Sequence, residues 1–224
     1  MSWPVSLTSM RARVRKRADV VSETSRHPDS EIDQYINDAI AELWDKIVEK
    51  NKDYRLSQST ISVLSGVAIY DLPLSCYKVR ALIYSDGYIT SPLKPFRLED
   101  IDHTGNSLTS TVSYLRYRSV GAQIFFDKLP ASDATVTLYY TPIAPQYINP
   151  SDTVDFINGW DKYVEFKAAG DIECVDKRSD MSALYQLAEA QLARIRNAAN
   201  SRDVGEPETV LRRDISIPWY TRTR

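Results

Sequence analysis

Apolar residues recur with a helical period near both ends of the chain, whereas they alternate with polar residues in its middle. The clearest helix is expected at 30–50, where apolar side chains return at i, i+3, i+4, i+7 and i+8. Pro28 precedes this segment, and acidic residues fill its first turn, where the helix dipole favours them. Asp29 or Ser30 is expected to cap the helix, and its apolar stripe is expected to face a core.

Three further amphipathic helices are expected, at about 6–18, 160–177 and 179–201. The small run Ala168-Ala169-Gly170 would let another backbone approach closely. The candidate N-cap residues are Ser6 or Thr8 for the first of these helices and Ser179 or Asp180 for the last.

Between about 59 and 148 the pattern changes to short alternating strands, about six of them, separated by turn residues. Hairpins are expected at three places where glycine follows a turn position, at 65–66, 86–87 and 120–121. The run ATVTLYYTP alternates well and ends at Pro142, and FRLEDIDHTG is expected to form a short helix. Few glycines and short turns favour a compact sandwich or barrel.

These patterns together predict an α+β fold. The N- and C-terminal segments are expected to form an antiparallel helical bundle, with an antiparallel β-rich domain inserted between them and an extended arm at the C-terminus. The expected boundaries are 1–58 for the N-terminal helices, 59–148 for the inserted domain, 149–201 for the C-terminal helices and 202–224 for the arm.

The net charge is only −2, but charge is unevenly distributed along the chain. Residues 1–20 carry five basic groups against Asp19, and residues 29–53 carry eight acids against three lysines. Such segments can pair within one subunit or between neighbouring copies. The basic segment could also contact DNA phosphates. No motif for reading bases accompanies it, so sequence-specific binding is not expected.

Known catalytic motifs are missing from the sequence, including GxSxG, Walker A, GxGxxG and HExxH. His27 and His103 are expected at the surface or in capping roles. Cys76 and Cys174 match no zinc-binding spacing, and free thiols are the simplest expectation, with a disulfide left open. No catalytic residue, metal ligand or cofactor is therefore assigned, and the chain is not expected to be an enzyme.

Two pairs of acidic residues leave a catalytic role and a metal-binding role open. Glu31 and Asp38 fall on the polar side of one helix and could in principle act as a glycosidase pair. Asp152 and Asp155 precede a helix, where Asp commonly caps or forms a turn, although they could also bind a metal. No signal peptide or membrane-spanning segment is found, so a cytoplasm-like compartment is expected at first.

A family resemblance rests on seven segments taken in order: RVRKRADV, DSEIDQYINDAIAELWDKI, IYDLP, IFFDKLPA, VTLYYTP, DTVDFINGWDKYVEFKAA and RDVGEPETV. Their order and spacing resemble the head-to-tail adaptor (connector) proteins of tailed bacteriophages, especially those of short-tailed phages. The resemblance covers most of the chain. It implies a structural virion protein at the head–tail junction. Such adaptors form a ring, typically of twelve copies, beneath the portal and extend the DNA channel.

The resemblance also implies a set of partners. These are other copies of the chain, the portal protein, a tail or nozzle protein, and double-stranded DNA that passes through the lumen without sequence-specific contact. Catalysis, cofactors and membranes are not implied, and assembly is expected in the host cytoplasm.

The C-terminal arm is the segment in which the resemblance places the portal contacts, at Leu211, Arg212, Arg213, Ile215, Ile217, Trp219 and Tyr220. Ile215, Ile217 and Trp219 alternate, so one face of a strand could dock on a partner's sheet edge or groove. Leaving Trp219 and Tyr220 in solvent would forgo about 1.5–3 kcal/mol of burial each. The alternative functions are a virion-associated peptidoglycan glycosidase and a non-specific DNA-binding accessory protein.

Overall fold

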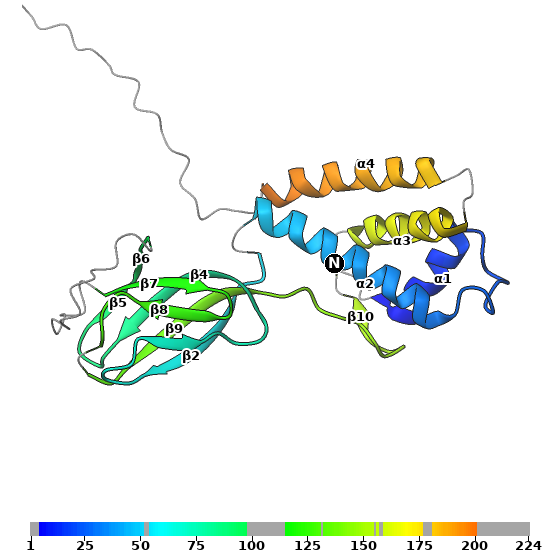
Figure 1. Cartoon of the computed structure of the whole chain (residues 1–224). Helices are drawn as coiled ribbons and strands as arrows, with labels where there is room; N and C mark the ends of the chain where they lie inside the picture. The colour runs from blue at the N-terminus through cyan, green and yellow to red at the C-terminus, as the bar shows by residue number, and fades with distance from the viewer. Residues whose placement is uncertain are drawn as a thin grey trace, which may run out of the picture.

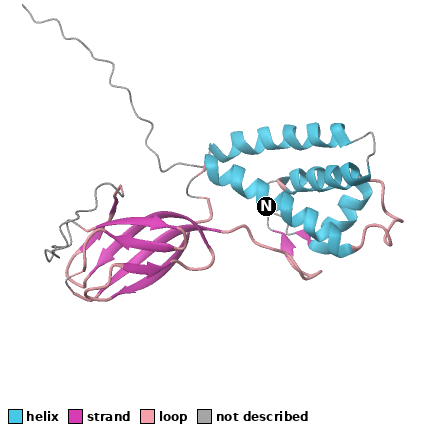
Figure 2. Ribbon diagram, viewed as in Figure 1, coloured by secondary structure: helices cyan, strands magenta, loops and turns pink. Residues whose placement is uncertain are grey.

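The computed structural model describes residues 5–51, 54–97, 115–130, 132–154, 156, 159–176 and 181–200. Within them the chain forms a helical unit and a β-sandwich (Figure 1), and each of the two has its own hydrophobic core. Apart from one short strand pair that lies among the helices, helices and strands occupy separate parts of the molecule, as Figure 2 shows. The expected α+β class is therefore confirmed.

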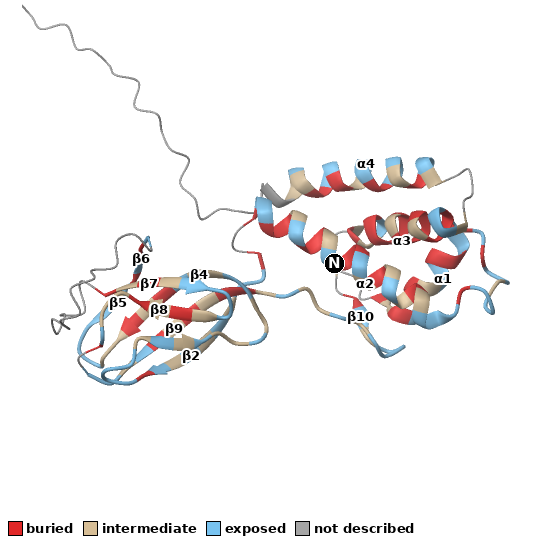
Figure 3. Ribbon diagram, viewed as in Figure 1, coloured by how far each residue is buried: buried red, intermediate tan, exposed pale blue. Residues whose placement is uncertain are grey.

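The described residues contain four helices, close to the four that were expected: α1 (Leu7–Arg17), α2 (Asp29–Lys50), α3 (Asp161–Asp176) and α4 (Met181–Asn200). Both α2 and α3 pack against all of the other helices, and α3 makes the more extensive contacts, so it is the central helix of this unit. The expected apolar stripes are buried, and in Figure 3 the buried faces of the helices turn toward one another. Fully buried examples from separate helices are Met10, Ile36, Val164 and Ile195.

The helix N-termini differ from one another in how they are capped. The Ser6 side chain accepts a hydrogen bond from the backbone N of Ser9 at 3.2 Å, which confirms one of the two expected caps of α1. The expectation that Asp29 or Ser30 caps α2 is wrong, because Pro28 holds the N-cap position without a side-chain hydrogen bond. The Asp29 carboxylate lies in the first turn and binds arginines of α1 instead. Residues 179–180 lie outside the described part of the chain.

A two-stranded antiparallel ladder joins the start of the helical unit to the segment before α3. It pairs β1 (Val5–Ser6) with β10 (Thr153–Val154), and the backbone N of Leu7 adds a bond to Asp152 O at 2.8 Å. Neither strand was expected: the first lies at the start of the helix expected at about 6–18, and the second lies in the loop expected before the helix at about 160–177. Strands of two residues carry no periodic signal, so only the folded structure reveals them.

Two four-stranded sheets pack face to face in the β-sandwich. The first has the order β2 (Ser57–Val63), β9 (Ala134–Pro142), β4 (Cys76–Ser85), β5 (Thr90–Pro92). The second has the order β3 (Ile69–Asp71), β8 (Gln123–Phe126), β7 (Arg116–Val120), β6 (Lys94–Pro95). All of these neighbours are antiparallel except β6 and β7, which run parallel. The sandwich core includes Leu82, Ile124, Val136 and Leu138.

Two of the three expected hairpins are confirmed, β4–β5 around Gly87 and β7–β8 around Gly121. The hairpin expected at 65–66 is wrong, because β2 pairs with β9 and β3 pairs with β8. Gly66 has a φ of 77° and lies where the chain passes from one sheet to the other. Most of the short helix expected at 96–105 lies outside the described residues.

The helical unit and the sandwich meet at the C-terminal half of α2. The indole Nε1 of Trp44 donates to the carbonyl of Pro142 at the end of β9, at 3.0 Å. The Arg80 guanidinium donates to Thr141 Oγ1 at 2.9 Å and to the carbonyl of Val48 at 3.4 Å. These bonds connect the two units directly.

Candidate functional site

Part of the charge on α1 is neutralised by α2 within the same subunit. The guanidinium of Arg11 donates to both carboxylate oxygens of Asp33, with its Nε 2.6 Å from Oδ1. This hydrogen bonding raises the pKa of Arg11. Arg15 lies 2.8 Å from Asp29 and also donates to the carbonyl of His27 at 2.7 Å. Of the two arrangements left open by the sequence, pairing within the subunit is therefore present in the structure.

The other arginines of α1 turn toward α3. Arg13 Nη1 lies 3.0 Å from Glu165 Oε1 and 2.9 Å from Asp161 Oδ2, and Arg17 Nε lies 3.8 Å from Glu165 Oε2. The Glu165 side chain is only 5% exposed, whereas the two arginines are nearly half exposed. The Arg17 guanidinium also lies 4.8 Å from the centroid of the Phe166 ring. A buried carboxylate thus holds two cations at the surface in fixed positions.

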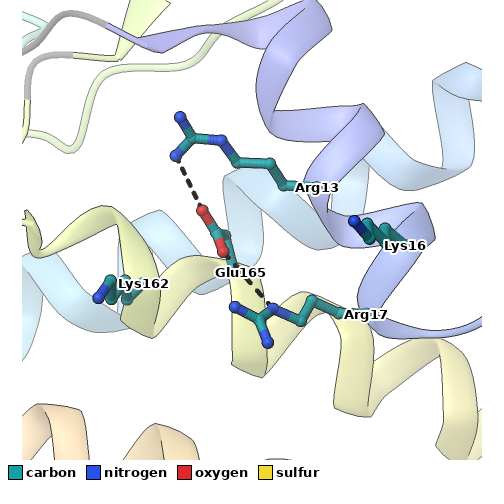
Figure 4. A pocket seen from close by; sticks show the side chains of 5 residues that line it. All are labelled: Arg13, Lys16, Arg17, Lys162 and Glu165. Carbon is teal, nitrogen blue, oxygen red and sulfur yellow. Dashed lines mark hydrogen bonds and ion pairs between the residues drawn. The ribbon is translucent and has the colours of Figure 1, made fainter.

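A cavity of about 480 Å³ lies between α1 and α3, and Figure 4 shows the five side chains that line it. Arg13 and Arg17 reach from α1 to the Glu165 carboxylate, while Lys16 and Lys162 extend beside them. Lys16 and Lys162 are exposed and form no ion pair within the described part of the chain. We call Arg13, Lys16, Arg17 and Lys162 the basic cleft.

A group of carboxylates lies where α2, α3 and α4 meet. We call Asp38, Glu42, Asp171 and Glu189 the acidic seam; the first two are on α2, the third on α3 and the last on α4. Lys167 Nζ lies 3.3 Å from Glu42 Oε2 and 3.9 Å from Asp171 Oδ1. Within the described residues Lys167 pairs with two of these four acids, so the seam keeps an excess of negative charge.

The acids of the seam shift the pKa of Asp171 and of the neighbouring Tyr163. Burial raises the pKa of Asp171, and the negative charges of Glu42 and Asp38 raise it further. The hydroxyl of Tyr185, which donates to Asp171 at 2.7 Å, and the charge of Lys167 oppose this rise. The pKa of Tyr163 is raised by burial and by Glu42, Glu189 and Asp171. Glu42 and Asp38 thus act on Asp171, whereas Glu189 acts on Tyr163.

The basic cleft and the acidic seam lie on opposite sides of α3. Lys162 and Glu165 contribute to the cleft, whereas Lys167 and Asp171 contribute to the seam. At 3.6 residues per turn, the mean directions of these two pairs around the helix differ by about 170°. Our reading of the sequence did not single out these four residues, although their i, i+3 and i, i+4 spacings on one helix carry the signal.

His27 is buried, with 1% of its surface exposed, so the expected surface role is wrong. Its Nε2 lies 3.1 Å from Asp176 Oδ2 at the end of α3, and Arg26 Nη2 lies 2.7 Å from Asp176 Oδ1. Pro28, the N-cap residue of α2, follows His27 directly, so the histidine lies at the junction of the loop and the helix. A single histidine in a loop has no periodic signature that would have revealed this. His103 lies outside the described residues.

Glu23, His27 and Asp176 have the composition of a metal site, with their ligand atoms all within 4.8 Å of one another. The Arg26 guanidinium beside Asp176 already supplies the positive charge that an ion would bring. This geometry favours a structural cluster that fastens the loop before α2 to the end of α3.

The acidic pairs named from the sequence have local roles. Glu31 accepts a hydrogen bond from the hydroxyl of Tyr35 at 3.0 Å, whereas Asp38 is exposed. Burial, together with Glu31, raises the pKa of Tyr35 to about 12. Asp152 accepts hydrogen bonds from the backbone N of Ile148 and of Asn149, both at 2.9 Å, which confirms its turn role. Asp155 lies outside the described residues.

Two further predictions concern the two cysteines and the C-terminal arm. Cys76 and Cys174 are free thiols, as expected. The arm residues expected to contact a portal lie outside the described part of the chain: Leu211, Arg212, Arg213, Ile215, Ile217, Trp219 and Tyr220.

A family model for SU10 adaptor proteins matches residues 5–213, which include both the helical unit and the sandwich. The chain belongs to the SU10 adaptor protein family. This confirms the resemblance seen in the sequence and identifies the protein as a structural phage adaptor. Comparison with curated proteins gave no match. Among the described residues of this SU10 adaptor, no helix is long and apolar enough to cross a membrane.

Proposed function

We propose that this SU10 adaptor forms a ring of about twelve copies that joins the portal to the tail and extends the DNA channel. The observation that carries the proposal is the adaptor-family match over residues 5–213. The charge distribution supports it, because a closed ring needs two different faces on each subunit that fit one another. The basic cleft and the acidic seam would supply two such faces.

The C-terminal arm is the proposed anchor on the portal. Its apolar residues alternate over 215–219, which suits an extended segment laid along a groove or sheet edge. The arginines of the arm would meet acidic groups on the portal. The contact residues proposed from the sequence are Leu211, Arg212, Arg213, Ile215, Ile217, Trp219 and Tyr220.

Co-sedimentation with a purified portal ring from the same virus tests this proposal. Four proteins are compared: the full chain, a 1–201 truncation, the double variant I217D/W219A, and T221A/T223A as a control that changes the same arm. We expect the full chain and the control to decorate the portal as a ring, and the other two to lose binding by at least about tenfold. Failure of the full chain to bind the portal would overturn the proposed function. Unchanged binding of the truncation would remove the arm from it.

A further inference from the structure

We propose that, in the assembled ring, the basic cleft of one copy receives the acidic seam of the next copy. The inference rests on the proposed ring and names the surfaces that close it. In a head-to-tail ring the contact is heterologous, so each subunit must present two different, complementary faces on roughly opposite sides. The two sides of α3 meet this condition, because Lys162 lies in the cleft and Asp171 in the seam.

The cleft has positive charge that its own subunit leaves unused. Arg13 and Arg17 are held by Glu165, and Arg13 also by Asp161, but Lys16 and Lys162 have no acidic partner within the described residues. The cavity of about 480 Å³ between the helices is large enough to admit carboxylate side chains from outside. Because Glu165 holds Arg13 by a hydrogen bond and Arg17 by an ion pair, less side-chain entropy is lost when an acid docks than for free arginines.

The acidic seam has an excess of negative charge, which complements the positive charge of the cleft. Asp38 and Glu189 are exposed and form no ion pair within the described part of the chain. Lys167, the cation that the described part of the chain places between the acids, is already shared by Glu42 and Asp171. Cations from a neighbour would relieve the mutual repulsion that helps to raise the pKa of Asp171.

A neighbouring copy suits the cleft better than DNA does. The cations occupy one compact cavity between two helices, whereas duplex DNA is bound along a track of basic groups that follows its backbone. A carboxylate from a partner protein needs only one such pocket.

Charge exchange between the two faces tests the proposal in the full chain. The cleft variant is K16E/K162E, the seam variant is D38K/E189K, and K50E/K94E is a control with the same charge change at exposed lysines elsewhere. Adaptor copies per portal ring are counted by particle imaging over a range of protein concentration. Thermal unfolding of each variant shows that it is folded, and K16Q/K162Q gives a milder cleft variant should the reversal unfold the chain.

Each variant alone is expected to need about tenfold or more protein to close a ring, because like charges then face each other. An equal mixture of the two variants restores closure. When the two variants alternate around the ring, each acidic cleft meets a basic seam and each basic cleft meets an acidic seam. The quadruple variant K16E/K162E/D38K/E189K also restores closure, because both of its faces are exchanged. The defect of K16Q/K162Q is smaller and shrinks as salt screens the contact.

The outcomes separate this inference from the proposed function. Rings that form normally with every variant would leave the adaptor function standing and overturn the docking surfaces. Wild-type protein that forms no ring on the portal would overturn the function itself. Normal rings together with salt-sensitive duplex binding that K16E/K162E loses would assign the cleft to DNA and reject the second copy as its occupant.

Discussion

His27 Nε2 lies 3.1 Å from Asp176 Oδ2, and this contact joins the loop before α2 to the last residue of α3. Both side chains are 1% exposed. The contact therefore replaces water for two buried polar groups. It also fixes the point where the chain passes from α1 into α2, next to the arginines that bind Asp29.

Replacing His27 with alanine is expected to reduce the free energy of unfolding by about 2–3 kcal/mol, because it removes a buried partner of a carboxylate. Arg26→Lys keeps a positive charge beside Asp176 and is expected to cost less than about 1 kcal/mol. Urea denaturation of both variants measures the difference. Equal, small losses would show that the cluster adds little to stability.

Gly170→Ala tests the contact between α3 and α4. A Cβ at this position would lie 2.9 Å from Cε1 of Tyr185. We expect the added methyl to cost about 1–3 kcal/mol by overpacking, and this cost outweighs the helix-propensity gain of about 1 kcal/mol. In a Tyr185→Ala background the same change should stabilise the protein, because only the propensity gain remains. A double-mutant cycle by thermal unfolding reads the sign in each background.

A close approach of another backbone was expected at 168–170, but the neighbour of Gly170 is the ring of Tyr185. Gly170 leaves room for the ring of Tyr185, whose hydroxyl donates a hydrogen bond to Asp171. A destabilising effect of Gly170→Ala in both backgrounds would indicate that something other than the ring limits the space.

The stability contributed by Asp171 should depend on pH in a direction opposite to that of Asp152. The pKa of Asp171 is raised in the folded protein, mainly by burial, so stability falls as the pH rises from the ordinary pKa through the folded pKa. Asp171→Asn should therefore stabilise the protein near pH 7, and the gain should vanish below the ordinary pKa of 3.8. Denaturant titrations at several pH values measure this gain.

Asp152 provides the matched control for that experiment. Backbone hydrogen bonds from Asn149 and Ile148 lower its pKa, so it contributes stability above the ordinary value that is lost as the pH falls through the folded pKa. Asp152→Asn should destabilise the protein at neutral pH and have no effect in strong acid. If both variants shift stability in the same direction, the opposite environments inferred for the two carboxylates are wrong.

The sequence predicted the helices well because each has an apolar stripe several turns long. Strand pairing was harder, since the alternation on either side of Gly66 gives strand positions but not the sheet to which each strand belongs. The basic residues of α1 were visible, yet their division between Asp33 on one side and Glu165 on the other depends on tertiary packing. The same holds for the acidic seam, which is assembled from three helices.

The junction between the helical unit and the sandwich should decide whether the two unfold together. Trp44 donates to Pro142 O at 3.0 Å, and Arg80 donates to Thr141 and to Val48 O. Trp44→Phe keeps the packing but leaves the carbonyl without this donor, at a cost of about 1–2 kcal/mol.

The W44F/R80A variant should broaden one cooperative thermal transition into two, because the separate cores then unfold independently. Calorimetry distinguishes these cases, with Arg118→Ala as an arginine control in the sandwich away from the junction. A single sharp transition in W44F/R80A would mean that these hydrogen bonds do not couple the units.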